Sequence, residues 1–324
     1  MSNASDVANR VSNIRICFLG TPDFAAEHLQ TLIQHSYFKV AGVVTQPDRP
    51  SGRKMQLTSS AVKVLALQNN LEVLTPENLR KDSACFEKIK SWNCDIAVVV
   101  AFGQILNQEF LDHFRFGAVN IHGSLLPKWR GAAPIQRSIE AGDTNTGVSL
   151  QKMVKKLDAG PVIGERKIQL DHEITATALY SALSKLGCEL LINELIEFTK
   201  GRIQPQDQDE SQVTLAVKIE KEESLILWDT SAEKIHNKVR AFTMGPGTHC
   251  LWNGNRLKIH RTKVVDQKAT GKISEVVSCE NGALILQTGQ GQISLLEVQL
   301  ESKSKMLIEN FLKSHRPQKG DLFV

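Results

Sequence analysis

The sequence lacks the features that would place the protein in a membrane or export it. Its longest apolar runs, such as residues 96–102, are far shorter than the ~20 residues that a membrane-spanning helix needs. Residues 1–10 are polar and carry Asp6, without the apolar core of a signal peptide or the arginine-rich bias of a transit peptide. We therefore expect a cytoplasmic protein with no membrane partner.

Paired cysteines and paired metal ligands are also missing. No two cysteines form a C-x-x-C pair, so the sequence predicts neither a disulfide framework nor a zinc site. The cysteines are Cys17, Cys85, Cys94, Cys188, Cys250 and Cys279. The histidines other than His122 show no ligand spacing, and we expect no metal.

The dinucleotide-binding pattern of glycines is absent as well. Gly20-Thr21-Pro22 follows the first apolar run, but the second glycine that lets the backbone approach a pyrophosphate is missing. A nicotinamide dinucleotide is therefore not expected at this position.

What is present is a regular alternation of short apolar runs and helical segments. With 324 residues, 41% of them hydrophobic and 23% charged, the chain is long enough for two soluble domains. The alternation predicts a parallel, Rossmann-like α/β sheet over residues 12–202. Strands are expected at residues 14–19, 40–44, 71–74, 95–101, 117–122, 147–153 and 162–170, the last two pairing at one edge. Helices are expected at residues 25–33, 61–69, 82–91, 107–114, 132–141 and 177–200, and residues 46–58 are expected to form a loop.

The pattern changes after residue 202. Residues 203–212 are rich in Gln and Asp and indicate a linker. Residues 213–324 show short alternating strands with Gly and Asn turns, which predict a small, OB-like β-barrel. Its strands are expected at residues 247–252, 255–260, 272–277, 283–287 and 292–299, after one helix at 231–242.

Three polar side chains suggest the chemistry. Asn120 and His122 are two positions apart on a predicted strand, so both point to one face. Asp158 follows a second predicted strand and can orient the imidazole. An amide, an imidazole and a carboxylate without a nucleophilic Ser or Cys favour direct acyl transfer, in which Asn120 and His122 donate to the developing oxyanion. The alternative is that Asn120 and His122 are polar residues satisfied at a strand end.

The residues after His122 form a turn at the carboxyl end of a strand, where α/β sheets bind ligands. Leu125 and Leu126 are apolar where loops are usually polar. They can form a wall for a flat heterocycle, plug the core, or do both.

These motifs carry a resemblance. Asn120-x-His122-x-Ser124-Leu-Leu-Pro127 with Leu157-Asp158-x-Gly160 resembles the signature of the 10-formyltetrahydrofolate-dependent formyltransferases. The stretches that begin at Gly20, Thr45 and His122 are similar to the branch of that family that formylates methionyl-tRNA. Phe102 and the Lys54-Met55-Gln56 run depart from that pattern.

The resemblance implies an activity and its substrates. Asn120, His122 and Asp158 would be the catalytic residues, and Ser124, Leu125, Leu126 and Pro127 would contact 10-formyltetrahydrofolate. The formyl acceptor would be the methionine of the initiator methionyl-tRNA. No metal would take part, and we expect a monomer.

Basic residues give candidate tRNA contacts. Arg49, Arg53 and Lys54 lie on one predicted loop, which in the resembling family approaches the acceptor stem, and Lys218 matches a family position associated with tRNA. Between residues 234 and 272 nine basic residues stand against one acid. The candidates there are Lys234, Lys238, Arg240, Arg256, Lys258 and Arg261. Such a stripe is either a phosphate track or an ordinary solvated face.

Two other functions remain open from the sequence. One is formyl transfer to another amine, such as a glycinamide ribonucleotide or an amino sugar. The other is a non-catalytic RNA-binding protein with the same fold.

Overall fold

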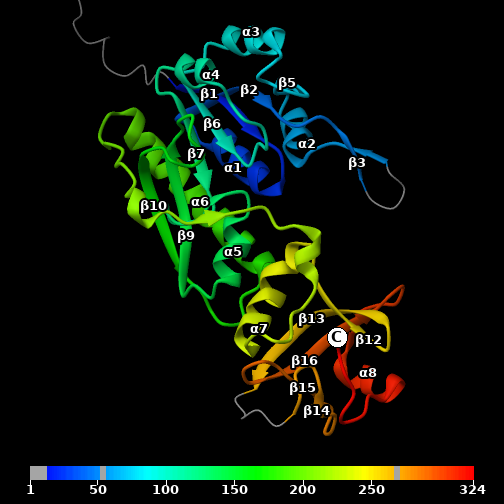
Figure 1. Ribbon diagram of the computed structural model, residues 1–324. Helices are drawn as coiled ribbons and strands as arrows, with labels where there is room; N and C mark the ends of the chain where they lie inside the picture. Colours follow the sequence, from blue (N-terminus) through cyan, green and yellow to red (C-terminus); the bar gives the residue numbers. More distant parts are fainter. Residues whose placement is uncertain (1–12, 52–55, 266–270) are drawn as a thin grey trace, which may run out of the picture. The chain divides into compact units, whose positions relative to one another are not determined.

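The computed structural model of the chain describes residues 13–51, 56–265 and 271–324 (Figure 1). Its contacts divide the chain into two compact units. Unit 1 comprises the residues up to 130, residues 147–167 and residues 181–214; unit 2 comprises residues 131–146, 168–180 and 215–324.

Unit 1 is built on a seven-stranded sheet with the order β10-β9-β7-β6-β1-β2-β5. The strands are β1 (Ile14–Gly20), β2 (Phe38–Val44), β5 (Val73–Leu74), β6 (Ile96–Val100), β7 (Ala118–His122), β9 (Asn145–Lys152) and β10 (Val162–Gln169). The first five are parallel, and β9 runs antiparallel to β7. The predicted α/β class and the pairing of the last two strands at one edge are thus confirmed.

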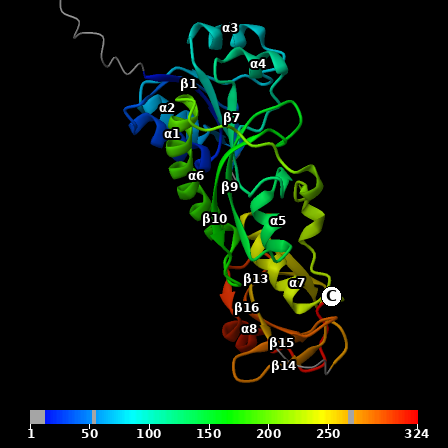
Figure 2. The same ribbon diagram turned by 90° about the vertical axis from the view of Figure 1, so that its left-hand side faces the viewer.

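Helices cover both faces of this sheet (Figures 1 and 2). They are α1 (Asp23–Gln34), α2 (Ala61–Gln68), α3 (Ser83–Ser91), α4 (Gln108–His113) and α6 (Ala176–Thr199). Phe86 of α3 and Phe110 of α4 pack in one core with Cys17 and Val99 of the sheet. On the other face α6 comes close to β7, since a Cβ on Gly187 would lie 3.4 Å from Ile121. The strand that carries Asn120 and His122 is therefore fixed from both sides.

The structure corrects the expected loop at residues 46–58. Two short strands, β3 (Arg49–Ser51) and β4 (Gln56–Thr58), pair antiparallel there. All three residues of β4 are exposed, so the pairing buries no apolar face and leaves no alternating pattern in the sequence.

Unit 2 contains an antiparallel sheet that curls around its own core, in agreement with the predicted small barrel. The order is β12-β13-β16-β15-β14, with β17 on β16. The strands are β12 (Thr248–Trp252), β13 (Asn255–Val265), β14 (Val276–Ser278), β15 (Leu284–Gln287), β16 (Gln292–Leu300) and β17 (Met306–Leu307). The expected strand at 272–277 is wrong over most of its length, because residues 272–275 close a turn in which the Lys272 amide donates to Glu275.

Three helices accompany the unit 2 strands: α5 (Pro134–Glu140), the predicted α7 (Ala232–Ala241), and α8 (Ile308–His315). The sequence reading missed α8, whose Ile308 and Phe311 are buried in the core of the sheet. Short elements complete the fold: β8 (Arg130–Gly131) pairs with β11 (Leu215–Ala216), and single 3-10 turns lie at Glu210–Gln212, Lys221–Ser224 and Phe242–Met244.

Among the helices of the described residues, none is long and apolar enough to cross a membrane.

Candidate active site

Asn120 and His122 lie on β7, close to the carboxyl end of the parallel strands. In the register with β9, Asn120 lies opposite Gln151 and His122 opposite Ser149. The His122 side chain is 6% exposed and Asn120 is half-buried. Period 2 along the strand gives the two side chains one common face, as the sequence predicts.

Both ring nitrogens of His122 face oxygen atoms. Nε2 is 2.8 Å from the carbonyl oxygen of Trp129, which can only accept, so Nε2 carries a proton. Nδ1 is 3.6 Å from Oδ2 of Asp158, whose side chain is 12% exposed. The structure thus brings two of the three predicted catalytic residues into ion-pair distance, although 36 positions separate them in the sequence.

Asp158 is held at its side chain and at its backbone. The Gln151 amide donates to Oδ1 at 3.0 Å, and the Gln208 amide donates to the backbone carbonyl at 2.8 Å. Asp158 adopts a φ of +47°, a left-handed conformation that is uncommon outside glycine. The sequence reading missed both glutamines: Gln151 becomes visible only with the β7–β9 register, and Gln208 lies in the stretch whose composition indicates a linker.

The predicted folate-binding turn is pinned by hydrogen bonds. The Ser124 hydroxyl donates to the Lys128 carbonyl at 2.6 Å, and the Leu126 amide donates to the Ser149 hydroxyl at 3.0 Å. Leu126 is 7% exposed and fills the core, while Leu125 and Pro127 are half-buried. Of the predicted apolar wall of Leu125 and Leu126, only Leu125 therefore remains partly accessible, together with the neighbouring Pro127.

A network of charged and amide groups ties the segment around residue 208 to the site. Arg130, only 3% exposed, donates from Nε and Nη2 to Gln208 Oε1 at 3.0 and 2.8 Å. Arg130 Nη2 also lies 2.8 Å from Glu210 Oε1, whose other oxygen is 2.6 Å from Lys156 Nζ. Hydrogen bonds from Arg130 and then Lys156 lower the pKa of Glu210 to about 2. Residues 208–210 are therefore held to unit 1 by side-chain hydrogen bonds and ion pairs.

The predicted tRNA-contacting residues differ in exposure. Lys218, Lys234, Lys258, Arg261 and Arg49 are exposed, and Arg49 pairs with Glu77 at 3.2 Å. Lys238 and Arg256 are half-buried, and burial lowers the pKa of Lys238. Arg53 and Lys54 lie outside the described residues.

Arg240 is the buried member of the predicted basic stripe. It is 5% exposed and donates to Asn237 Oδ1 at 3.0 Å and to the carbonyls of Asp171 and Ile174 at 3.3 and 3.1 Å. These hydrogen bonds hold α7 to residues 171–174 of unit 2. The Arg240 guanidinium is therefore buried and does not contribute to the charge of the surface.

The side chains of β13 alternate between the core and the outer face. Arg256 and Lys258 point away from the core, and Leu257 and Ile259 between and after them are buried. Arg261 follows a change in register between β13 and β16 and is also exposed.

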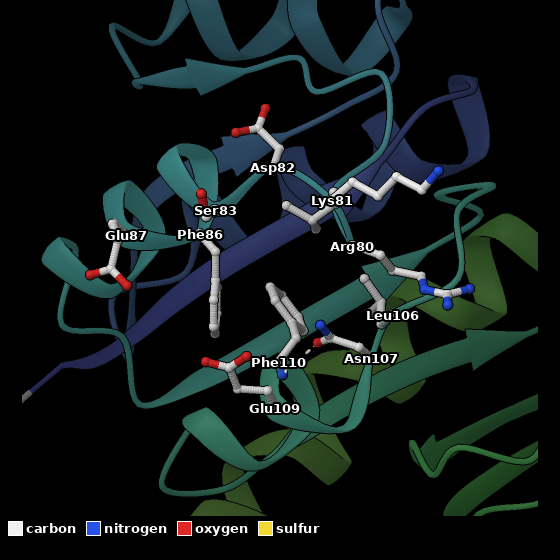
Figure 3. A pocket seen from close by; sticks show the side chains of 11 residues that line it. Arg80, Lys81, Asp82, Ser83, Phe86, Glu87, Leu106, Asn107, Glu109 and Phe110 are labelled. Carbon is white, nitrogen blue, oxygen red and sulfur yellow. Dashed lines mark hydrogen bonds between the residues drawn. The ribbon is translucent and has the colours of Figure 1, made fainter.

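A cavity of about 160 Å³ in unit 1 lies apart from these residues (Figure 3). Aromatic and charged side chains line it together, among them Phe86, Phe110, Arg80, Asp82 and Glu109. None of the predicted site residues lines it. Within the described residues, no group of three or more His, Cys, Asp or Glu side chains is arranged to hold a metal ion.

Comparison with known proteins identifies the family. The family model described as "Formyl transferase" matches residues 14–195, and "Formyl transferase, C-terminal domain" matches residues 218–316. A methionyl-tRNA formyltransferase of Bdellovibrio bacteriovorus is 52% identical over 314 residues, which is 96% of this chain and 99% of that protein. One from Neisseria gonorrhoeae is 40% identical over 95% of this chain and 99% of its own length. The chain belongs to the methionyl-tRNA formyltransferase family.

Solved structures share the fold of this family. A sugar 3N-formyl transferase, WlaRD, superposes with a TM-score of 0.66 at 20% identity, over 90% of this chain and 99% of its own. HypX from Aquifex aeolicus, solved with tetrahydrofolic acid, has a TM-score of 0.60 at 18% identity, over 97% of this chain and 51% of its own. As a member of the methionyl-tRNA formyltransferase family, the chain is a formyl-transferring enzyme.

The Glu210 charge predicts a pH-dependent contribution to stability. Its pKa is about 2 in the folded protein and near 4.5 without its partners, so the contribution is present above pH 4.5 and is lost as the pH falls toward 2. We expect Glu210→Gln to lower the free energy of unfolding at pH 7, with the difference from wild type shrinking between pH 4.5 and pH 2. Urea unfolding of both proteins across this range measures it; a difference that stays constant down to the lowest pH contradicts the assignment.

Proposed function

We propose that the protein transfers the formyl group of 10-formyltetrahydrofolate to the α-amino group of methionine on initiator tRNA. Membership of the methionyl-tRNA formyltransferase family supports this proposal. The observation that carries it is the His122 ring, fixed between the Trp129 carbonyl and the Asp158 carboxylate beside Asn120.

The proposed catalytic roles follow from that geometry. Asn120 donates a hydrogen bond to the formyl oxygen from its amide, and His122 donates one from a protonated Nδ1, because its Nε2 proton is held by the Trp129 carbonyl. Both act as the neutral amine attacks the formyl carbon and negative charge gathers on that oxygen. A bond forms between the amine nitrogen and the formyl carbon, and the bond from that carbon to N10 of the folate breaks. The amine loses one proton and N10 gains one, and Asp158 stabilises positive charge on His122 while this proton moves.

The formyl donor would lie against residues 124–127. Leu125 and Pro127 offer partly accessible apolar surface for a flat ring, and Ser124 stabilises the turn through the Lys128 carbonyl. Gln151 Oε1 is buried and has no hydrogen-bond partner among the described residues, so a donor of the bound substrate or a water molecule can satisfy it. These groups fit a polar heterocycle bound beside Asp158.

For the tRNA we propose contacts through basic side chains. Lys218, Lys234, Lys258, Arg261 and Arg49 are exposed and Arg256 is half-buried. Arg53 and Lys54, which lie outside the described residues, complete the proposed set. Lys238 is half-buried and donates to the Leu225 carbonyl at 3.0 Å, so its contribution is the smallest, and Arg240 is left out because it is buried.

We further propose that residues 12–202 form the formyl-transferring domain and residues 213–324 the tRNA-binding domain. Residues 203–212 connect them, and Gln206 pairs with Val162 at the edge of the first. The protein would act in the cytoplasm as a monomer and without a metal.

Asn120→Ala is expected to slow formyl transfer strongly. Loss of one oxyanion donor costs about 10²–10³ in kcat. The dissociation constant for initiator tRNA should stay near that of wild type, because the amide contributes mainly in the transition state. Formylation of methionyl-tRNA at saturating substrates and a tRNA filter-binding titration measure the two quantities.

Asn310→Ala, which removes an exposed amide on α8, is the control for that experiment. Turnover by Asn120→Ala that matches this control would refute the oxyanion role. A protein that formylates glycinamide ribonucleotide or an amino sugar in preference to methionyl-tRNA would refute the proposed acceptor.

Charge reversal on β13 tests the tRNA face. Lys258→Glu and Arg261→Glu should each weaken tRNA binding and reduce the slope of log Kd against log salt by about 1, as loss of a phosphate contact does. Lys39→Glu, at an exposed position on β2, is the matched control. Unchanged affinity and slope in both β13 variants would mean that this face is only solvated.

A further inference from the structure

Gln208 bridges the loop that carries Asp158 and Arg130, the residue after Trp129. Its Nε2 donates to the backbone carbonyls of Asp158 at 2.8 Å and of Gly160 at 2.7 Å. Its Oε1 accepts from Nε and Nη2 of Arg130. Both donors and both lone pairs of the amide are therefore used.

The orientation of this amide follows from its partners. A guanidinium can only donate and a backbone carbonyl can only accept, so the amide oxygen must face Arg130 and the nitrogen must face the Asp158 loop. Turning the amide over would oppose two donors to two donors and two acceptors to two acceptors. The bridge is thus specific for a side chain that donates on one side and accepts on the other.

The backbone of the loop at residues 158–160 is constrained by further contacts besides those of Gln208. Asp158 sits at a φ of +47°, and Gly160 lies so close to the Lys152 carbonyl that no Cβ fits there. Gln151 fixes the Asp158 carboxylate at Oδ1. Gln208 fixes the backbone of Asp158 and so sets the position of its Cα, from which the side chain extends.

On its other side the bridge reaches the loop that fixes His122. Arg130 directly follows Trp129, whose carbonyl accepts the proton of His122 Nε2. Arg130 is 3% exposed and is also paired with Glu210, which in turn pairs with Lys156 of the Asp158 loop. The segment that contains Trp129 and Arg130 is therefore connected to the loop that contains Asp158 through residues 208–210.

We propose that Gln208 is a positioning residue that sets the distance between His122 Nδ1 and Asp158 Oδ2. The expected effects on kcat rest on the proposed function, formyl transfer to methionyl-tRNA. Gln208 touches neither reacting atom, so its removal acts on kcat through Asp158. Small displacements of a catalytic group cost as much as about 10²-fold in rate.

The test uses two variants of the full-length protein. Gln208→Glu keeps the size and the acceptor toward Arg130 but replaces the donor with a carboxylate oxygen that opposes two carbonyls. Gln208→Met keeps the length and removes every hydrogen bond, and it carries the test if the first variant fails to fold. Gln206→Glu, at an exposed position two residues away, is the matched control.

In both Gln208 variants kcat for formylation should fall about 10–100-fold, while KM for the folate and for the tRNA stays within about threefold of wild type. The control should keep wild-type kcat. A role confined to stability would instead lower the unfolding temperature and leave kcat per folded molecule unchanged, and that result overturns the proposal.

A crystal structure of the folded variant separates this proposal from the proposed function. The His122 Nδ1–Asp158 Oδ2 distance should change by about 1 Å or more from the 3.6 Å of the wild-type chain. An unchanged distance overturns the positioning role. Failure of the wild-type protein to formylate methionyl-tRNA overturns the proposed function, and the structural comparison still decides the role of Gln208.

Discussion

The site depends on the His122 ring, in which the neighbouring groups determine the hydrogen-bonding role of each nitrogen. The Trp129 carbonyl accepts a hydrogen bond from Nε2, so Nδ1 is the nitrogen available for the proposed chemistry, and Nδ1 faces the Asp158 carboxylate. Because the ring is 6% exposed, water competes little with these interactions, and the charges act over a short distance in a medium of low polarity. Neither nitrogen can exchange roles with the other without breaking the bond to Trp129.

The fold supplies this arrangement from three separate pieces of chain. Strand β7 presents Asn120 and His122, the turn after it returns the Trp129 carbonyl to the ring, and the loop after β9 carries Asp158. Trp129 and Asp158 both adopt positive φ values, +62° and +47°, which cost free energy and persist only where surrounding bonds enforce them. The hydrogen bonds of Ser124, Gln151 and Gln208 provide that enforcement.

Local patterns in the sequence were enough to predict most of the sheet and the shared face of Asn120 and His122. They failed where a local apolar pattern is absent or ambiguous, and where the place of a residue depends on a tertiary contact. The paired strands β3 and β4 bury no apolar face, and α8 was hidden among short strands although its Phe311 is fully buried. Gln208 lies in a polar stretch whose composition is that of a linker, and only the tertiary contact with Asp158 reveals its place in the site.

Arg240 shows that a count of charged residues in the sequence does not predict which of them are exposed. In the sequence it is one of nine basic residues in a stripe, but its guanidinium is buried against backbone carbonyls. Charge counting locates a basic segment without telling which side chains reach the surface, because that depends on which face of α7 packs inward. The alternation on β13 is more reliable because buried Leu257 and Ile259 set the direction of their neighbours.

We propose that the Asp158 carboxylate acts on His122 during formyl transfer. The most direct measurement is the single-turnover rate of transfer from 10-formyltetrahydrofolate to methionyl-tRNA by Asp158→Asn, which keeps the shape of the side chain and removes its charge. The account predicts a rate about 10²–10⁴-fold below wild type at saturating substrates. A rate within about threefold of wild type would contradict it.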